Sequence, residues 1–149
     1  MTDTAIVALL VGLATFVIAA EQWRVARAKL RLDLFEKRYA LYELLWSYMS
    51  GHVQDWEKLN DKFVELQNHL PQFYFLFGDD IGAYASSALS KGIEMQTAKN
   101  VIKRGMGTPD SIQGYQFQTS KLYEWFYAEG NGLRLKFKPY LGFEEWTGL

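Results

Sequence analysis

The chain has 149 residues, of which 49% are hydrophobic and 16% are aromatic, and it contains no cysteine. Lysine and arginine number 16 against 17 aspartate and glutamate residues, so no excess of positive charge draws the chain to a nucleic acid polymer. The absence of cysteine excludes thiol catalysis and thiolate zinc sites, and it agrees with a reducing compartment.

An uncharged apolar run, TAIVALLVGLATFVIAA, occupies residues 4–20. As a helix it would rise about 26 Å, close to the ~30 Å hydrocarbon core of a bilayer. Only Gly12 and Thr15 interrupt the run, so it has no polar face with which to lie on a membrane surface. The run therefore predicts a transmembrane anchor over residues 1–23.

Two other interpretations fit this run less well. A signal peptide begins with basic residues, whereas the first four residues here are Met, Thr, Asp and Thr. A buried core helix needs a shell of other elements, and the roughly 130 remaining residues could only just supply one. The membrane anchor is the interpretation that the residues favour.

The charges that follow the run predict its direction. Four cations come directly after it: Arg24, Arg27, Lys29 and Arg31. Only Glu21 opposes them, and no lysine or arginine precedes the run. Because cytoplasmic flanks are rich in lysine and arginine, residues 24–149 are expected to form a cytosolic domain, with a short N-terminus outside.

The anchor region also predicts two kinds of contact. Arg24, Arg27 and Arg31 share one helix face, where contact with anionic lipid headgroups would contribute about 1 kcal/mol per residue. Ala8 and Gly12 form a small-xxx-small pair, which lets two membrane helices approach closely. The expected partners are therefore membrane lipids and either a second copy of the chain or another protein.

The first cytosolic helix is expected to continue out of the membrane without a break. One apolar stripe recurs at alternating spacings of three and four: Val25, Ala28, Leu32, Phe35, Tyr39, Tyr42, Trp46 and Met49. A second stripe widens this face: Leu30, Leu34, Leu41, Leu45 and Tyr48. The wide face favours the core helix of a bundle over a narrow parallel coiled coil, and Ser50-Gly51 is expected to end the helix.

A second helix and a third are expected next. The second carries one apolar side: Val53, Trp56, Leu59, Phe63, Leu66 and Leu70. Pro71 should stop or kink it, and residues 73–77 then lead to Gly78. The third helix is expected from about Asp80 to Lys103, and its many small residues permit close approach of a neighbour, the first helix being favoured.

A fourth helix should follow the turn Gly105-Met106-Gly107. Thr108-Pro109-Asp110 combines an N-cap, a first-turn proline and an acid. Its inner face is marked by Ile112, Tyr115, Leu122 and Phe126, and Gly130-Asn131-Gly132 is expected to close it.

The tail admits two interpretations. Residues 133–138 alternate with period two, as in a half-buried strand, but only residues 72–77 offer such a strand a partner. An extended or short helical tail packed across the bundle is therefore favoured. Tyr140, Phe143 and Trp146 could also lie against the inner leaflet, although packing on the domain is the favoured fate. The predicted fold is all-α: one transmembrane helix continuous with a small cytosolic bundle of about four helices.

Few residues could carry chemistry. Asp61, Glu65 and His69 share a helix face at metal-ligand spacing, but neither histidine follows a glutamate by three residues, so a solvated face is favoured. Lys103 and Arg104 precede a glycine turn and could hold a phosphate or nucleotide, although cations also commonly end helices. No catalytic residue, metal site or cofactor is expected.

The stretch from Lys29 to Tyr42, KLRLDLFEKRYALY, resembles the juxtamembrane signature of a group of uncharacterised bacterial single-pass inner-membrane proteins. Phe75-Leu76-Phe77-Gly78-Asp79 matches their second element, an FLFG-acid turn, and residues 137–141 resemble a closing element. The resemblance spans most of the chain. It implies a bacterial inner (plasma) membrane protein with a cytosolic helical domain, and it brings no catalytic residues.

These observations lead to one functional expectation and two alternatives. The first is a membrane-anchored interaction and assembly module that self-associates or docks a partner protein. The main alternative is a membrane effector, for example in antiviral defence, whose cytosolic domain senses a nucleotide or protein through Lys103 and Arg104 and perturbs the membrane. An enzyme that uses Asp61, Glu65 and His69 with bound metal is the third possibility.

Overall fold

The computed structural model describes residues 3–54 and 59–142. These ranges contain four helices: α1 (Asp3–Gln54), α2 (Leu59–Phe77), α3 (Asp79–Arg104) and α4 (Pro109–Leu141). The prediction of an all-helical chain of about four helices is confirmed for the described residues. No strand forms within them, since residues 72–77 lie in α2 and residues 133–138 lie in α4.

By internal contacts the chain divides into two units, Met1–Lys37 and Arg38–Leu149. The helix α1 is nevertheless uninterrupted from Asp3 to Gln54, which confirms that the apolar run continues directly into the next helix. The boundary predicted between residues 23 and 24 concerns the edge of a membrane rather than packing, and it stays a prediction.

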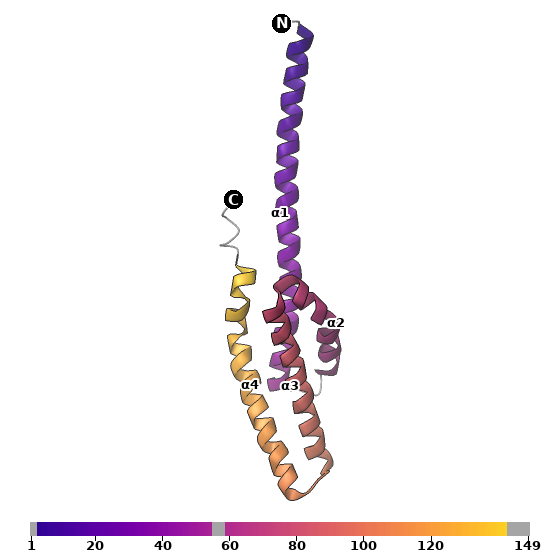
Figure 1. The fold of residues 1–149 in the computed structure, drawn as a ribbon, viewed down its shortest axis with the longest axis vertical. Helices are drawn as coiled ribbons and strands as arrows, with labels where there is room; N and C mark the ends of the chain where they lie inside the picture. Colours follow the sequence, from indigo (N-terminus) through magenta and orange to yellow (C-terminus); the bar gives the residue numbers. More distant parts are fainter. Residues whose placement is uncertain (1–2, 55–58, 143–149) are drawn as a thin grey trace. The chain divides into compact units, whose positions relative to one another are not determined.

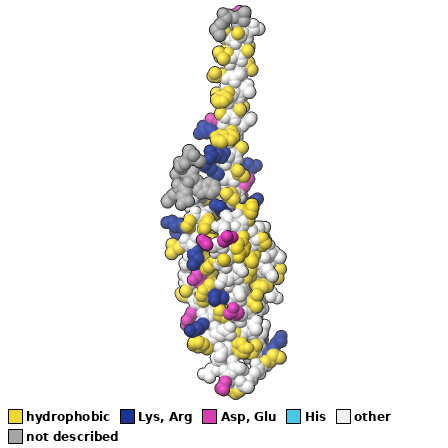
Figure 2. Space-filling model, viewed as in Figure 1, with side chains coloured by type: hydrophobic (Ala, Val, Ile, Leu, Met, Phe, Trp, Pro, Cys, Tyr) yellow, Lys and Arg dark blue, Asp and Glu magenta, His cyan; other side chains and the backbone are white. Residues whose placement is uncertain are grey.

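No described residue covers the apolar stretch of α1. None of its membrane-length window is buried, and Phe16 is 74% exposed. By length and composition this helix could cross a membrane, whereas a core helix of the domain would be mostly buried. Thr15 donates a hydrogen bond to the Val11 carbonyl at 2.8 Å, so this hydroxyl is satisfied within the helix. Figure 2 shows the apolar side chains giving way to lysine and arginine along α1.

The second unit is an antiparallel helical bundle, in which successive helices run in alternating directions (Figure 1). Its largest fully buried side chains come from all four helices: Tyr48, Phe73, Phe126, Phe137, Leu45, Met49, Leu66, Met95 and Leu133. The closest backbone approaches are between α2 and α3 and between α3 and α4. The backbone of α1 lies farther from its neighbours than α3 lies from α2 and α4, and its aromatic side chains extend across this distance into the core.

The first stripe predicted on α1 is only partly buried. Trp46 and Tyr39 are 48% and 43% exposed, while Met49 is fully buried. The core instead takes the second stripe, with Leu41, Leu45 and Tyr48 buried, together with Leu44 and His52. Periodicity marks a wide apolar face on this helix, and the neighbouring helices cover only one side of it.

Two glycines of α3 leave room for aromatic rings, and these rings come from both α1 and α2. A Cβ placed on Gly92 would overlap Tyr48 and His52 of α1, and one placed on Gly82 would overlap the ring of Tyr74 in α2. The expected approach of α3 to α1 is therefore limited to these side-chain contacts at Gly92. The backbone of α3 lies nearest to α2 and α4.

The predicted boundaries of α3 and the start of α4 are confirmed. Gly105 adopts the left-handed conformation that ends α3, and its N–H bonds to the Ile102 carbonyl. The Thr108 hydroxyl accepts a hydrogen bond from the Ser111 N–H at 3.3 Å, and Pro109 occupies the first turn. On the inner face of α4, Leu122 and Phe126 are buried, whereas Ile112 and Tyr115 are half-buried.

Two predicted helix ends are wrong, and Pro71, predicted to stop or kink its helix, does not stop it. The helix α1 passes Ser50-Gly51 and continues to Gln54, α2 passes through Pro71, and α4 passes through residues 130–132 to Leu141. An interior glycine costs a helix about 1 kcal/mol, whereas burying a leucine or phenylalanine contributes about 1.5–3 kcal/mol. Leu133 and Phe137 are fully buried beyond the glycines of α4, so burial outweighs the local preference.

The helix predicted from Val53 onward is confirmed from Leu59. Val53 itself belongs to α1. Leu59 and Leu66 are buried, and Phe63 and Leu70 are half-buried, as the apolar side predicted. Trp56, and the tail residues Phe143 and Trp146, lie outside the described residues.

Candidate functional site

The cations predicted to contact lipid lie on the surface of α1. Arg24 forms an ion pair with Glu21 at 3.0 Å, and both side chains are largely exposed. The guanidinium of Arg27 lies over the ring of Trp23, 5.3 Å from its centroid. Arg31 is half-buried. An exposed Trp–Arg pair directly after an apolar run suits the headgroup region of a bilayer, and headgroup contact remains a prediction.

Ala8 and Gly12 are both exposed on α1, and a Cβ on Gly12 would meet no atom within 4 Å. No packing in the described chain therefore accounts for a glycine at this position. The pair remains available to another helix, and self-association through it stays a prediction.

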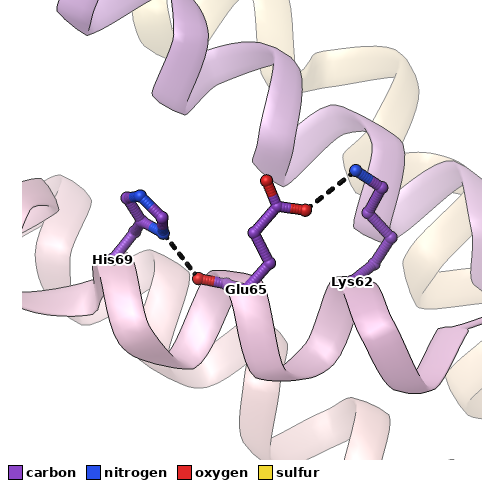
Figure 3. Close-up of polar contacts among 3 residues, drawn as sticks. All are labelled: Lys62, Glu65 and His69. Atoms are coloured by element: carbon purple, nitrogen blue, oxygen red, sulfur yellow. Dashed lines mark hydrogen bonds and ion pairs between the residues drawn. The ribbon is translucent and has the colours of Figure 1, made fainter.

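The candidate metal ligands on α2 are held in other contacts (Figure 3). Lys62 forms an ion pair with Glu65 at 2.9 Å, and Nδ1 of His69 donates to the Glu65 carbonyl at 2.8 Å. Asp61 is exposed. The structure does not bring Asp61, Glu65 and His69 together as a metal-binding group, nor any other such trio among the described residues.

Lys103 and Arg104 lie exposed in the last turn of α3. The nearby start of α4 is already satisfied, because Thr108 caps it and the carboxylate of Asp110 lies in its first turn. An anion would have to compete with that carboxylate. Ligand binding at Lys103 and Arg104 remains a prediction, and alanine at both positions tests it.

Arg38 occupies a position that sequence reasoning missed. Its Nε donates to the Leu76 carbonyl at 3.1 Å, and its Nη1 donates to the Tyr140 carbonyl at 3.3 Å. Both carbonyls lie in the last turns of their helices, where no helical N–H remains to satisfy them and the helix dipole is negative. One guanidinium therefore ties the ends of α2 and α4 to α1.

An aromatic cluster surrounds this guanidinium. The ring of Phe77 lies 5.9 Å from the Arg38 guanidinium, and it meets Phe137 and Tyr140 edge-on, at centroid distances of 5.0 and 5.4 Å. Tyr42 contacts Phe137 at 5.4 Å. These residues come from all three motifs on which the resemblance rests, so the motifs meet in space. Their separation in the chain gave no local signal of this.

Replacing Arg38 with methionine should lower the free energy of unfolding by about 2 kcal/mol, because hydrogen bonds from a charged donor are lost at two helix ends. Arg38→Lys should recover only part of this, since an ammonium lacks the fork that reaches both carbonyls. Urea unfolding measures the change. Lys37→Met, at the exposed neighbouring position, is the matched control, and an equal loss there would contradict the assignment.

A second cluster that the sequence did not predict surrounds His52. The imidazole is 6% exposed, stacks on Phe126 with ring centroids 4.2 Å apart, and meets Tyr48 edge-on at 4.7 Å. Within the described chain, His52 Nε2 and Tyr48 Oη have no hydrogen-bond partner. Burial, with a smaller effect of the Lys99 charge, lowers the pKa of His52 to about 4, and burial raises the pKa of Tyr48.

A third cluster joins α3 to α4 through cations and rings. The Tyr84 hydroxyl donates to Glu129 at 2.9 Å, and Lys136 lies 4.8 Å above the Tyr84 ring and 3.5 Å from Glu129. Trp125 lies one turn before Glu129 in α4, and Lys91 of α3 lies 5.1 Å from the centroid of its ring. Burial, then the bond to Glu129, raises the pKa of Tyr84, so this phenol stays a neutral donor. These contacts stabilise the α3–α4 pair.

The geometry of these clusters is that of a packed scaffold. Comparison with protein-family models, with curated proteins and with solved structures finds no match. The features of this chain that bear on its function are the uncovered apolar helix, the cations that follow it and the exposed aromatic side chains of the bundle.

Proposed function

We propose that the chain is a membrane-anchored interaction and assembly module of the bacterial inner membrane. The observation that carries this proposal is the uninterrupted helix α1. Its apolar window has no buried residue, while the same helix supplies Leu45, Tyr48 and Met49 to the core of the second unit. A helix of this kind joins an anchor to a folded domain without a flexible linker.

The direction proposed for the anchor rests on charge. Cations follow the apolar run and none precedes it, so the second unit is on the cytoplasmic side. Arg24, Arg27 and Arg31 contact the anionic headgroups there. The domain has exposed aromatic side chains, and docking of a second copy or of a partner protein is the activity that these surfaces support.

The anchor is tested by charge insertion into full-length protein. Leu10→Arg combined with Leu13→Arg should move the protein out of the alkali-resistant membrane fraction, because each arginine near the centre of a span disfavours insertion by about 2.5–3.5 kcal/mol. Leu30→Arg is the matched control, because Leu30 is 70% exposed but lies beyond the run. Retention of the double variant in the membrane would refute the anchor.

Assembly is tested on the wild-type protein. Its mass, measured after purification from native membranes in mild detergent, should exceed that of one 17.2 kDa chain by a whole second copy or a stoichiometric partner. Protease added to spheroplasts should leave the domain intact, and protease added to inverted vesicles should digest it. A lone monomer, or digestion from outside, would overturn the corresponding part of the proposal.

A further inference from the structure

A groove of about 170 Å³ runs between α1 and α4 in the second unit. Trp46 and Val53 line it from α1, and Phe126, Tyr127 and Gly130 line it from α4. None of the described residues that line it is charged. Trp46 is 48% exposed and Tyr127 is 59% exposed, so two large rings of this α1–α4 groove remain in contact with solvent. Exposed aromatic side chains beside a concave surface are typical of a docking site.

Nothing in the described chain requires a glycine at position 130. It lies inside α4, where glycine is disfavoured, and its φ is not positive. A Cβ at this position would meet no atom within 4 Å. Neither backbone conformation nor packing therefore calls for glycine. The missing side chain leaves a hollow on the α4 side of the groove, opposite the bulk of Trp46 on the α1 side.

An acidic residue lies beside the groove on α1, and a basic residue lies beside it on α4. Contacts of Tyr42 with Phe137 and of His52 with Phe126 show that α1 and α4 are antiparallel. Glu43, one turn before Trp46, and Arg134, one turn after Gly130, therefore lie toward the same end of the groove, and both are exposed. Trp46 and Glu43 therefore lie on the α1 side, whereas Gly130 and Arg134 lie on the α4 side, next to Tyr127.

We infer that the occupant of the α1–α4 groove is a second copy of this chain. The inference rests on the proposed membrane anchor, because copies inserted in one direction have their second units on the same side of the membrane. In the pair that we infer, a twofold axis runs along α1 and α4 of the second unit, and it sets α1 of each copy opposite α4 of the other. Trp46 of one copy then fills the hollow at Gly130 of the other, and Glu43 faces Arg134. Each contact occurs twice.

Cross-linking tests the predicted register. Because the natural chain has no cysteine, an introduced cysteine is the only thiol in each copy. Two differently tagged chains, one Trp46→Cys and one Gly130→Cys, should form a mixed disulfide in native membranes, as should a Glu43→Cys and Arg134→Cys pair. Val64→Cys with Ile93→Cys is the control, since both positions are about half-exposed but lie on α2 and α3. Equal yields for the control would overturn the register.

Filling the hollow tests the surface itself. Gly130→Leu should raise the dissociation constant of the dimer at least tenfold and leave the unfolding midpoint undiminished. Gly114→Leu is the matched control, because Gly114 also lies in α4 with open space around it, away from the groove. Glu43→Arg and Arg134→Glu should each weaken the dimer, and the two together should restore it. A dimer insensitive to all three single variants would refute the inference.

The outcomes separate this inference from the proposed function. If the chains remain associated but Gly130→Leu has no effect, the groove is not the interface, while the assembly function stands. If Gly12→Leu dissociates the dimer and the groove variants do not, the contact lies in the anchor, and the inference about the groove is overturned. A monomer in native membranes, with no partner of any kind, would overturn both.

Discussion

Gly92→Ala should lower the free energy of unfolding by about 2–3 kcal/mol, through overpacking of the core. The added methyl group would overlap the Tyr48 hydroxyl and the His52 ring. Both side chains are buried, and Phe126 packs on both rings, so they have no free space to enter. The change is measured by urea or thermal unfolding of the full-length protein in mild detergent.

Two other glycines serve as controls for Gly92. Gly114→Ala meets no atom within 4 Å, and it should stabilise the helix by about 0.5–1 kcal/mol because alanine is the better helix former. Gly82→Ala meets the ring of Tyr74, which is 40% exposed and can turn toward solvent, so its effect should lie between the two. Stability equal to wild type for Gly92→Ala would show that α1 does not pack on α3 at this position.

The protein should also lose stability in acid through His52. Its pKa in the folded state, about 4, is below the ordinary value of 6.5, so as the pH falls the unfolded chain takes up the proton first. The stabilisation is complete above pH 6.5 and is lost progressively between pH 6.5 and 4. The difference between these two pKa values corresponds to about 3 kcal/mol of stability.

The surroundings of His52 account for this cost of protonation. Lys99 faces the site from α3, Tyr48 contributes a neutral hydroxyl from α1, and α4 and α2 contribute the apolar Phe126 and Leu59. Among the described residues, no carboxylate lines the adjacent cavity, which has a volume of only about 10 Å³. An imidazolium there has little water and no counter-ion among the lining residues.

Unfolding curves measured across this pH range test the prediction. His52→Gln should remove most of the loss below pH 6.5, although the variant is less stable at neutral pH. His69→Gln removes the only other imidazole in the chain, from the surface of α2, and should keep the loss. An unchanged pH dependence in His52→Gln would contradict the assignment.

Local signals in the sequence predicted the parts of the fold that depend on neighbouring residues. The Thr108 cap, the left-handed Gly105 and the start of α3 at the acids after Gly78 all follow from interactions within one turn. The apolar run and its junction with the next helix could likewise be recognised by composition. Gly130 does not end α4 and Pro71 does not stop α2, because the burial of side chains beyond each position outweighs its local preference.

For the candidate sites, too, local patterns could be read from the sequence, whereas contacts between distant residues could not. Arg24, Arg27 and Arg31 could be grouped from the sequence because they share one helix face directly after the apolar run. Asp61, Glu65 and His69 have the spacing of metal ligands, but a solvated face was favoured for them, and the fold does not bring them together. The roles of Arg38 and His52 could not be predicted. Arg38 bonds to carbonyls 38 and 102 residues away, and such partners leave no periodic trace.

The residue order of this chain is sufficient to specify an all-helical protein with an apolar first stretch followed by cations, since helix formation and hydropathy depend on residues close in the chain. The tertiary structure decides which side of α1 is covered, which glycines of α3 contact aromatic rings, and where the α1–α4 groove lies. Those features depend on side chains from distant segments competing for one volume, and the free energy of that packing exceeds the preferences of any single turn.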